Sequence, residues 1–338
     1  MKKRKAKSED ESIQDEKTKH QDEADLVCTK KREDKQRAKE DNTIKCYAFD
    51  LQQCLPTPYL NTSVAFYKRQ LWTFNLTFHE TTTGDVTCFM WHEAEGARGA
   101  NQIATCIFKQ LSSLTQQIKK AILYSDSCGG QNRNSHVSAM FLTLLQQCSQ
   151  LEQIDHKFMV SGHSHLECDV DHGMIEKQKK HLQMQISVPH DWYQLVRDTG
   201  KKKKFQVVEL NHKDFVNYSD LYKSHLKLKQ EDSNGNSFKW TELRWLRYRQ
   251  EFPKNIFFKS SLDEREEFRC MNLEGRISQD TPLNSLPCYT SSLVISNEKK
   301  ILDLLSPDFH DFDKNLKTTN NAKSTLHDLV KEKDEELE

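Results

Sequence analysis

The feature that most constrains the fold is a short apolar run that ends on an acid and leads through two glycines into a helical pattern. Residues Ala121-Ile-Leu-Tyr124 have the length and apolarity of a buried strand. Asp126 follows this run, a turn comes at Gly129 and Gly130, and residues 138–145 have the pattern of a helix. Strand ends of this kind carry catalytic or metal-binding acids in α/β folds. The stretch therefore predicts a functional edge of an α/β sheet, without naming a reaction.

The elements around this stretch predict a mixed sheet covered by helices. We predict strands at residues 44–50, 66–78, 86–91, 121–124, 153–161 and 205–210, and helices at 100–111, 138–145 and 167–181. A hairpin set followed by alternating strands and helices gives a mixed sheet. We therefore expect an α/β fold, a ribonuclease-H-like mixed sheet flanked by helices, with an irregular α+β C-terminal extension.

Composition divides the 338 residues into four segments. Residues 1–43 form a mixed-charge segment, disordered or a solvated helix, without a core of its own. We expect the ribonuclease-H-like core at 44–190, the C-terminal extension at 191–300 and a disordered polar tail at 301–338. The formal net charge is +0, so any attraction to nucleic acid must come from local patches.

Cysteine usage and hydropathy predict an intracellular protein. None of the ten cysteines forms a Cys-x-x-Cys pair, which gives no support to a structural zinc site and favours reduced, buried thiols. No signal-peptide pattern opens the chain and no apolar run approaches ~18 residues, so we expect neither secretion nor a membrane partner. The basic cluster Lys2-Lys-Arg-Lys5 resembles a nuclear-localisation signal, a pattern that also arises by chance.

Acids at two strand ends and on one helix predict a metal site. Asp50 ends the first predicted strand and Asp126 the fourth, and these strands are neighbours in a ribonuclease-H-like sheet. A third acid should come from the helix at 167–181, whose candidates are Glu167, Asp169, Asp171 and Glu176. Asp169, His172 and Glu176 share one face of this helix, and Asp171 points elsewhere.

Converging carboxylates suit hard cations. Two Mg²⁺ or Mn²⁺ ions ~3.5–4 Å apart activate water and stabilise the leaving oxygen in phosphodiester cleavage. We predict Asp50, Asp126 and Asp169 as metal ligands and catalytic residues, and we retain Glu176 as the next candidate for the third acid.

Four polar residues near these acids are candidate supporting residues. We expect His163 to fix its loop by a hydrogen bond, and His165 lies about one turn before Asp169. Asn132 and Asn134 either cap the next helix, the commoner role, or reach the site. Taken alone, Asp126 is better explained as a turn acid that satisfies free backbone amides, and only the joint arrangement of the acids favours a metal site.

Basic and aromatic residues after position 200 give a weak signal for nucleic-acid binding. Lys201, Lys203, Arg244 and Arg247 could hold a phosphate backbone, with Trp240 and Trp245 stacking on bases. A solvated loop at 201–204 and an amphipathic core helix at 239–249 explain the same residues more simply, and we favour them.

The chain resembles an uncharacterised animal family that is described only as a domain of unknown function and is similar to mobile-element proteins. The resemblance spans residues 20–270 and rests on Tyr124-Ser-Asp-Ser-Cys-Gly-Gly-Gln-Asn-Arg-Asn134, Gly162-His-Ser-His-Leu-Glu-Cys-Asp169 and Ile175-Glu-Lys177. It implies a DDE-type transposase or integrase core that uses Mg²⁺ or Mn²⁺ on DNA. Integrase-like cores take their last acid from a Glu, which favours Glu176, whereas the His-x-His and Asp run favours Asp169.

Two other functions fit parts of the sequence. A domesticated nuclear binding module would keep the fold without catalysis. A metallophosphoesterase would use Gly162-His-Ser-His165, but the Asp-x-His and Gly-Asn-His motifs of that class are missing from this sequence.

Overall fold

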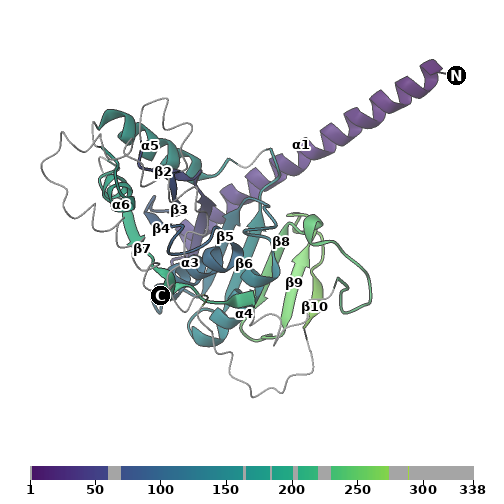
Figure 1. The fold of residues 1–338 in the computed structure, drawn as a ribbon. Helices are drawn as coiled ribbons and strands as arrows, with labels where there is room; N and C mark the ends of the chain where they lie inside the picture. The colour runs from purple at the N-terminus through teal and green to yellow at the C-terminus, as the bar shows by residue number, and fades with distance from the viewer. Residues whose placement is uncertain are drawn as a thin grey trace, which may run out of the picture.

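The computed structural model describes residues 2–59, 70–162, 165–182, 185–200, 205–219, 230–273 and 288. One mixed sheet of ten strands organises them (Figure 1). Its strands are β1 (Ile44–Leu51), β2 (Leu55–Thr57), β3 (Leu71–Glu80), β4 (Val86–His92), β5 (Lys120–Ser125), β6 (Gln153–Phe158), β7 (Gln206–Glu209), β8 (Trp245–Arg249), β9 (Asn255–Lys259) and β10 (Arg269–Asn272). The α-helices are α1 (Lys2–Glu40), α3 (Ala100–Ser112), α4 (Ser135–Gln147), α5 (Glu167–His181) and α6 (Pro189–Arg197), and short 3₁₀ turns lie at His212–Asp214 and Trp240–Glu242. The predicted α/β fold with a mixed sheet is confirmed.

The strand order is β10-β9-β8-β6-β5-β1-β3-β4-β7, and β2 pairs with β3. β1 lies near the middle, antiparallel to β3 and parallel to β5, which is in turn parallel to β6. These three parallel strands are buried on both faces, which explains their almost continuous apolar sequences. Their carboxyl ends meet at one edge of the sheet.

Helices cover both faces of the sheet. Tyr47, Phe49 and Leu123 face α3 and α4 in the main core. The alternate residues Ala48 and Tyr124 belong to a second core with α1 and the start of α5. The alternation follows from the two-residue period of a strand. Residues at even positions of β1 therefore face α1 and α5.

The chain after α6 extends the sheet at both edges. β7 pairs in parallel with β4, whereas β8, β9 and β10 continue antiparallel from β6. Strands from before and after residue 190 thus belong to one sheet. Within the described ranges, no helix is long and apolar enough to cross a membrane.

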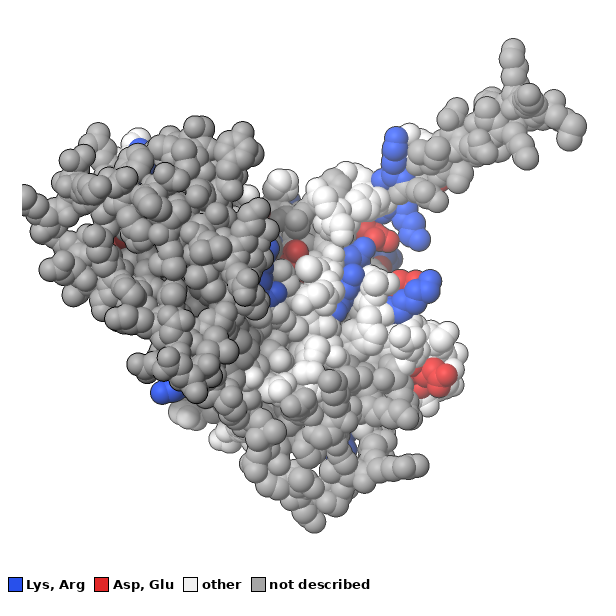
Figure 2. Space-filling view, viewed as in Figure 1, with Lys and Arg blue, Asp and Glu red and all other residues white. Residues whose placement is uncertain are grey.

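The mixed-charge N-terminal segment forms the long helix α1, and its second half is not merely solvated. Ala24, Val27 and Ala38 are buried against the sheet, as is the carboxylate of Asp34. Asp34 accepts hydrogen bonds from Lys157 and from the Tyr124 hydroxyl, the latter at 2.7 Å. The segment is thus a helix, but its second half is not solvated and adds Ala24, Val27 and Ala38 to the core over the sheet. Figure 2 shows acidic and basic side chains intermixed where α1 meets the body.

The amphipathic helix expected at 239–249 is also wrong. A 3₁₀ turn at Trp240–Glu242 leads into strand β8. Leu246 and Tyr248 face the main core, while Arg247 and Arg249 lie on the other face. This two-residue alternation of apolar and basic side chains is the pattern of a strand.

Candidate metal site

The register of the central strands brings Asp50 and Asp126 together. Ala48 of β1 pairs with Tyr124 of β5 in parallel. Asp50 lies two residues further along β1, and Asp126 lies just beyond the end of β5, near enough for its charge to raise the pKa of Asp50. This is the edge that the sequence predicted, at the carboxyl ends of parallel strands.

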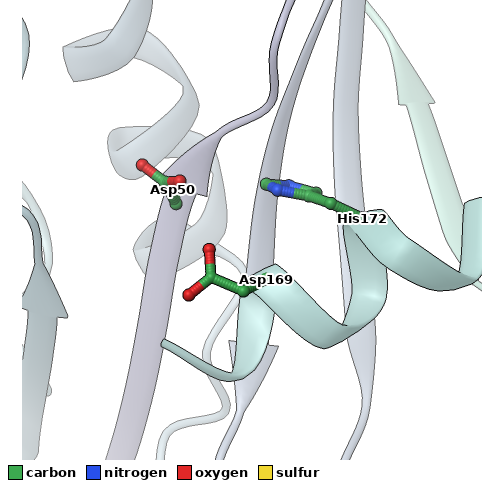
Figure 3. A group of neighbouring side chains, drawn as sticks. All are labelled: Asp50, Asp169 and His172. Atoms are coloured by element: carbon green, nitrogen blue, oxygen red, sulfur yellow. The ribbon is translucent and has the colours of Figure 1, made fainter. Parts of the chain in front are cut away.

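Helix α5 adds two further side chains to this edge. The Cys168 thiol donates to the backbone carbonyls of Ala48 and Thr77, both at 3.4 Å, and so fixes the first turn of α5 on β1 and β3. Asp169 and His172 consequently project toward Asp50 (Figure 3). One ligand atom from each of these three side chains lies within 4.8 Å of the other two.

Burial and like charges make Asp50 difficult to ionise. Burial and then the charges of Asp126 and Asp169 together raise the pKa of its carboxyl to about 7, while Arg98 acts in the opposite direction. Carboxylates that share a site repel each other, and a cation would remove this repulsion. The arrangement is electrostatically suited to a divalent cation.

His172 is held in the neutral form that can ligate a metal. Burial lowers the pKa of its imidazole to about 4, although Asp169 and Asp171 act in the opposite direction. Its Nε2 lies 3.1 Å from the hydroxyl of Thr77, which pairs with Asp50 in the β1–β3 register. Neutral imidazole is a common metal ligand.

Asp126 and Asp169 each use one carboxylate oxygen in local structure. Asp126 Oδ1 accepts from the backbone N–H of Cys128 at 3.2 Å and from the Asn132 amide. Asp169 Oδ2 accepts from the backbone N–H of Leu166 at 2.9 Å, which closes the first turn of α5. Within the part of the chain that the structure describes, the second oxygen of each carboxylate has no hydrogen-bond partner. The turn-acid role is real, and it leaves an oxygen for a ligand.

The two asparagines have different roles. Asn134 caps α4, because its Oδ1 accepts from the backbone N–H groups of His136 and Val137 at 3.0 and 3.1 Å. Asn132 is buried and donates to Asp126, so it orients the candidate ligand. The sequence allowed either helix capping or contact with the site. Asn134 has the first role and Asn132 the second.

The structure places the other acidic and histidine candidates outside the cluster. Glu176 is exposed on α5, and Glu167 pairs with Lys31 of α1 at 2.5 Å. Asp171 is buried and bonds the His79 ring at 2.8 Å. His165 is exposed, and its carbonyl accepts from Lys31, while His163 lies outside the described residues. Asp169 is therefore the acid of α5 that meets Asp50.

Most of the residues considered for nucleic-acid binding have structural roles. Trp245 is only 4% exposed, and Lys157 Nζ lies 3.9 Å from the centroid of its ring. Arg247 is paired with buried Asp155 at 2.6 Å. Trp240 is half-buried against the main core. A buried Trp245 is not available to stack on bases. Lys201 and Lys203 lie outside the described residues.

Three residues near the site were not among those predicted for it, although the sequence placed His172 on the same helix face as Asp169. His172 lies one helical turn after Asp169, a spacing that could have identified it as a ligand. Arg98 has no such signal, because its proximity to Asp50 depends on the path of the chain after β4. Arg133 is a further basic group near these acids, and its charge interacts with that of Asp126.

Comparison with known families places part of the chain in a family of unknown function. A family model described as a domain of unknown function (DUF7869) matches residues 76–249, slightly more than half of the chain. This range contains Asp126, Asp169 and His172, whereas Asp50 precedes it. No curated protein matches the sequence.

Proposed function

The chain belongs to the DUF7869 family, and from its site we propose that it binds Mg²⁺ or Mn²⁺ and cuts or joins DNA as a polynucleotidyl transferase. The observation that carries this proposal is the grouping of Asp50, Asp169 and His172 within 4.8 Å of one another, with Asp126 near enough for its charge to raise the pKa of Asp50. Carboxylate oxygens are the ligands that such hard cations prefer.

The order of the central strands supports the same proposal. β4, β3 and β1 are antiparallel neighbours, and β5 and β6 continue in parallel with β1. This order supports a ribonuclease-H-like sheet as part of the proposal, because DDE-type transposases and integrases build their acidic sites on that fold. We accordingly propose a transposon-derived protein that acts in the nucleus.

The residues of this chain have distinct roles in the proposed chemistry. Asp50, Asp126 and Asp169 would hold the cations, and Asn132 would orient Asp126. His172, neutral at physiological pH, would offer a nitrogen next to Asp50 and Asp169. The bound metal ions would supply an activated water and stabilise the leaving oxygen.

A cleavage and strand-transfer assay with Mn²⁺ tests the proposal. We expect Asp50→Asn, Asp126→Asn and Asp169→Asn each to lower the rate at least about 100-fold, because each removes a charged ligand. Glu176→Gln is the matched control, since it changes an exposed acid on the same helix as Asp169. Cleavage that survives Asp126→Asn would contradict the proposal. Loss of activity in Glu176→Gln would show that Glu176, and not Asp169, is the third acid.

One observation favours a second function, a non-catalytic binding module. Asp126 and Asp169 each have a local structural role, so a domesticated copy would retain them for folding alone. Such a module would bind DNA but show no cleavage in Mn²⁺, and Asp126→Asn would then change its stability without changing any rate.

A further inference from the structure

Two arginines lie beside the acid cluster, on the side away from β1. Arg133 follows the turn after Asp126, and its Nη1 donates to the carbonyl of Leu243 at 3.1 Å. Its guanidinium carbon lies 5.6 Å from the centroid of the Phe158 ring. The guanidinium is thus anchored on one side by a carbonyl and a ring.

Arg244 is the next residue after this carbonyl, and its backbone is fixed on both sides. Its carbonyl accepts from the N–H of Phe158 at 2.9 Å, and its own N–H donates to the carbonyl of Lys259 at 3.0 Å. Its side chain is 19% exposed, with Nη2 3.5 Å from a carboxylate oxygen of Glu23 on α1. Glu23 is 40% exposed, so this ion pair is weak.

The arginines and the acids occupy the same edge of the sheet. Ser125, which precedes Asp126, pairs with Phe158 of β6, and Phe158 is bonded to Arg244 at the start of β8. Arg244 therefore lies two strand spacings, about 10 Å, from the strand that carries Asp126. Arg133 spans the interval, because it leaves the loop after β5 and reaches the chain that enters β8.

The two guanidinium groups are close enough to repel each other. Burial lowers the pKa of Arg133, and the charge of Arg244 lowers it further, while Asp126 has the opposite effect. Two neighbouring guanidinium groups bind an anion well, because arginine presents paired N–H donors that match phosphate oxygens.

We propose that Arg133 and Arg244 form a phosphate-binding site that holds the nucleic-acid backbone next to the acid cluster. This inference rests on the proposed function, because it assigns a position to the same substrate. The nucleic-acid strand would run across the carboxyl ends of the parallel β-strands, from the acids toward β8. Phosphate contacts fix the register of a nucleic acid without reading its sequence.

Binding of labelled oligonucleotides to the full chain, followed by fluorescence anisotropy in EDTA, tests the inference. The variants are Arg133→Gln and Arg244→Gln, which remove the guanidinium charge and keep a polar side chain. The control is Arg197→Gln, which removes an arginine that pairs with Glu209 at the opposite edge of the sheet. The labelled oligonucleotides are single-stranded DNA and RNA of the same sequence. Inorganic phosphate and unlabelled oligonucleotide are the competitors.

We expect each arginine variant to weaken oligonucleotide binding roughly tenfold. The slope of log K against log salt for a single strand should also become shallower by about 0.7 for each phosphate that the variant no longer neutralises. The Arg197→Gln control should keep both the affinity and the salt dependence of the wild type. If the arginine variants bind only one of the two nucleic acids more weakly than the wild type does, the inference holds and that nucleic acid is the substrate.

Wild-type affinity and salt slope in both arginine variants would overturn the inference, as would the absence of oligonucleotide binding by the wild type. If inorganic phosphate displaces the labelled oligonucleotide as effectively as unlabelled oligonucleotide does, the arginines form a site for small anions, and the inference is overturned. These results differ from failure of the proposed function, which is read from cleavage in Mn²⁺. A folded protein that binds through both arginines yet never cuts DNA would retain the phosphate site and lose the catalytic proposal.

Discussion

At the scale of single residues, Asp50 is held in a place that opposes its charge. Burial and two neighbouring acids raise its pKa to about 7, above the ~3.8 of an unfolded chain. The folded protein then binds more protons than the unfolded chain between these values, so its stability falls as the pH rises through this window. In EDTA at pH 8 we expect Asp50→Asn to raise the free energy of unfolding by about 2–4 kcal/mol.

The measurement is urea unfolding of wild type and Asp50→Asn at several pH values. The difference should shrink as the pH is lowered toward 4, because Asp50 of the folded protein is then protonated and no longer has a charge to bury. A constant difference at all pH values would mean that the gain comes from packing and not from the charge.

His156 provides a second pH effect at the residue scale, in the opposite direction. It is fully buried among aromatic rings, and burial lowers the pKa of its imidazole to about 3. The unfolded chain binds the extra proton between about pH 3 and 6.5, so folding stability falls as the pH is lowered through this window. We expect a loss of about 2 kcal/mol from this group between pH 7.5 and pH 5.

The test compares urea unfolding of wild type and His156→Gln at the two pH values. Glutamine can keep the hydrogen bond to Ser125, which the imidazole makes at 2.9 Å, and does not titrate. The variant should lose less stability than the wild type at pH 5. Equal losses would assign the acid sensitivity to other groups.

At the scale of elements, the sequence predicted the strands and helices of the central sheet well, because apolar periodicity determines them locally. The convergence of Asp50 and Asp126 followed from the expected strand order. Arg133 was not predicted, since its contact with Leu243 joins segments 110 residues apart. The buried face of α1 was not predicted either, because its apolar residues are few and the partner of Asp34 is a lysine 123 residues away.

The attachment of α1 depends on this buried ion pair. Asp34 and Lys157 are both about 1% exposed, and Lys157 also lies over the ring of Trp245. Removing one partner leaves the other charge buried and unpaired, so we expect Asp34→Ala to destabilise the protein by about 3–5 kcal/mol. Glu33→Ala is the matched control on the same helix, since its carboxylate is 49% exposed and its loss should have little effect.

Thermal unfolding and amide hydrogen exchange of α1 measure the effect. In Asp34→Ala we expect faster exchange in the second half of α1 than in β5 or β6. Uniform destabilisation without selective exchange would show that the ion pair stabilises the sheet and not the attachment of the helix.

At the scale of the whole molecule, the candidate site exists only when the sheet is assembled. Its acids come from β1, from the loop after β5 and from α5, and the unfolded chain keeps them apart. A cation that binds this group therefore stabilises the folded state alone, by an amount that depends on its concentration relative to Kd. At a Mn²⁺ concentration of ~100 times Kd the gain is about 2.7 kcal/mol, and we expect a corresponding rise in Tm.

Two variants make this stabilisation specific. Asp126→Asn should abolish the rise in Tm with Mn²⁺, because it removes a ligand charge, and Glu176→Gln should preserve it. Asp50→Asn should be more stable than the wild type in EDTA and less stabilised by Mn²⁺, because the repulsion that the cation relieves is already absent. If Mn²⁺ raises the Tm of all three variants as much as that of the wild type, the ion binds elsewhere. Asp50→Asn is thus expected to be more stable than the wild type in EDTA but to gain less stability from Mn²⁺. These two responses together test whether the repulsion among the acids is the cost of a cation-binding site.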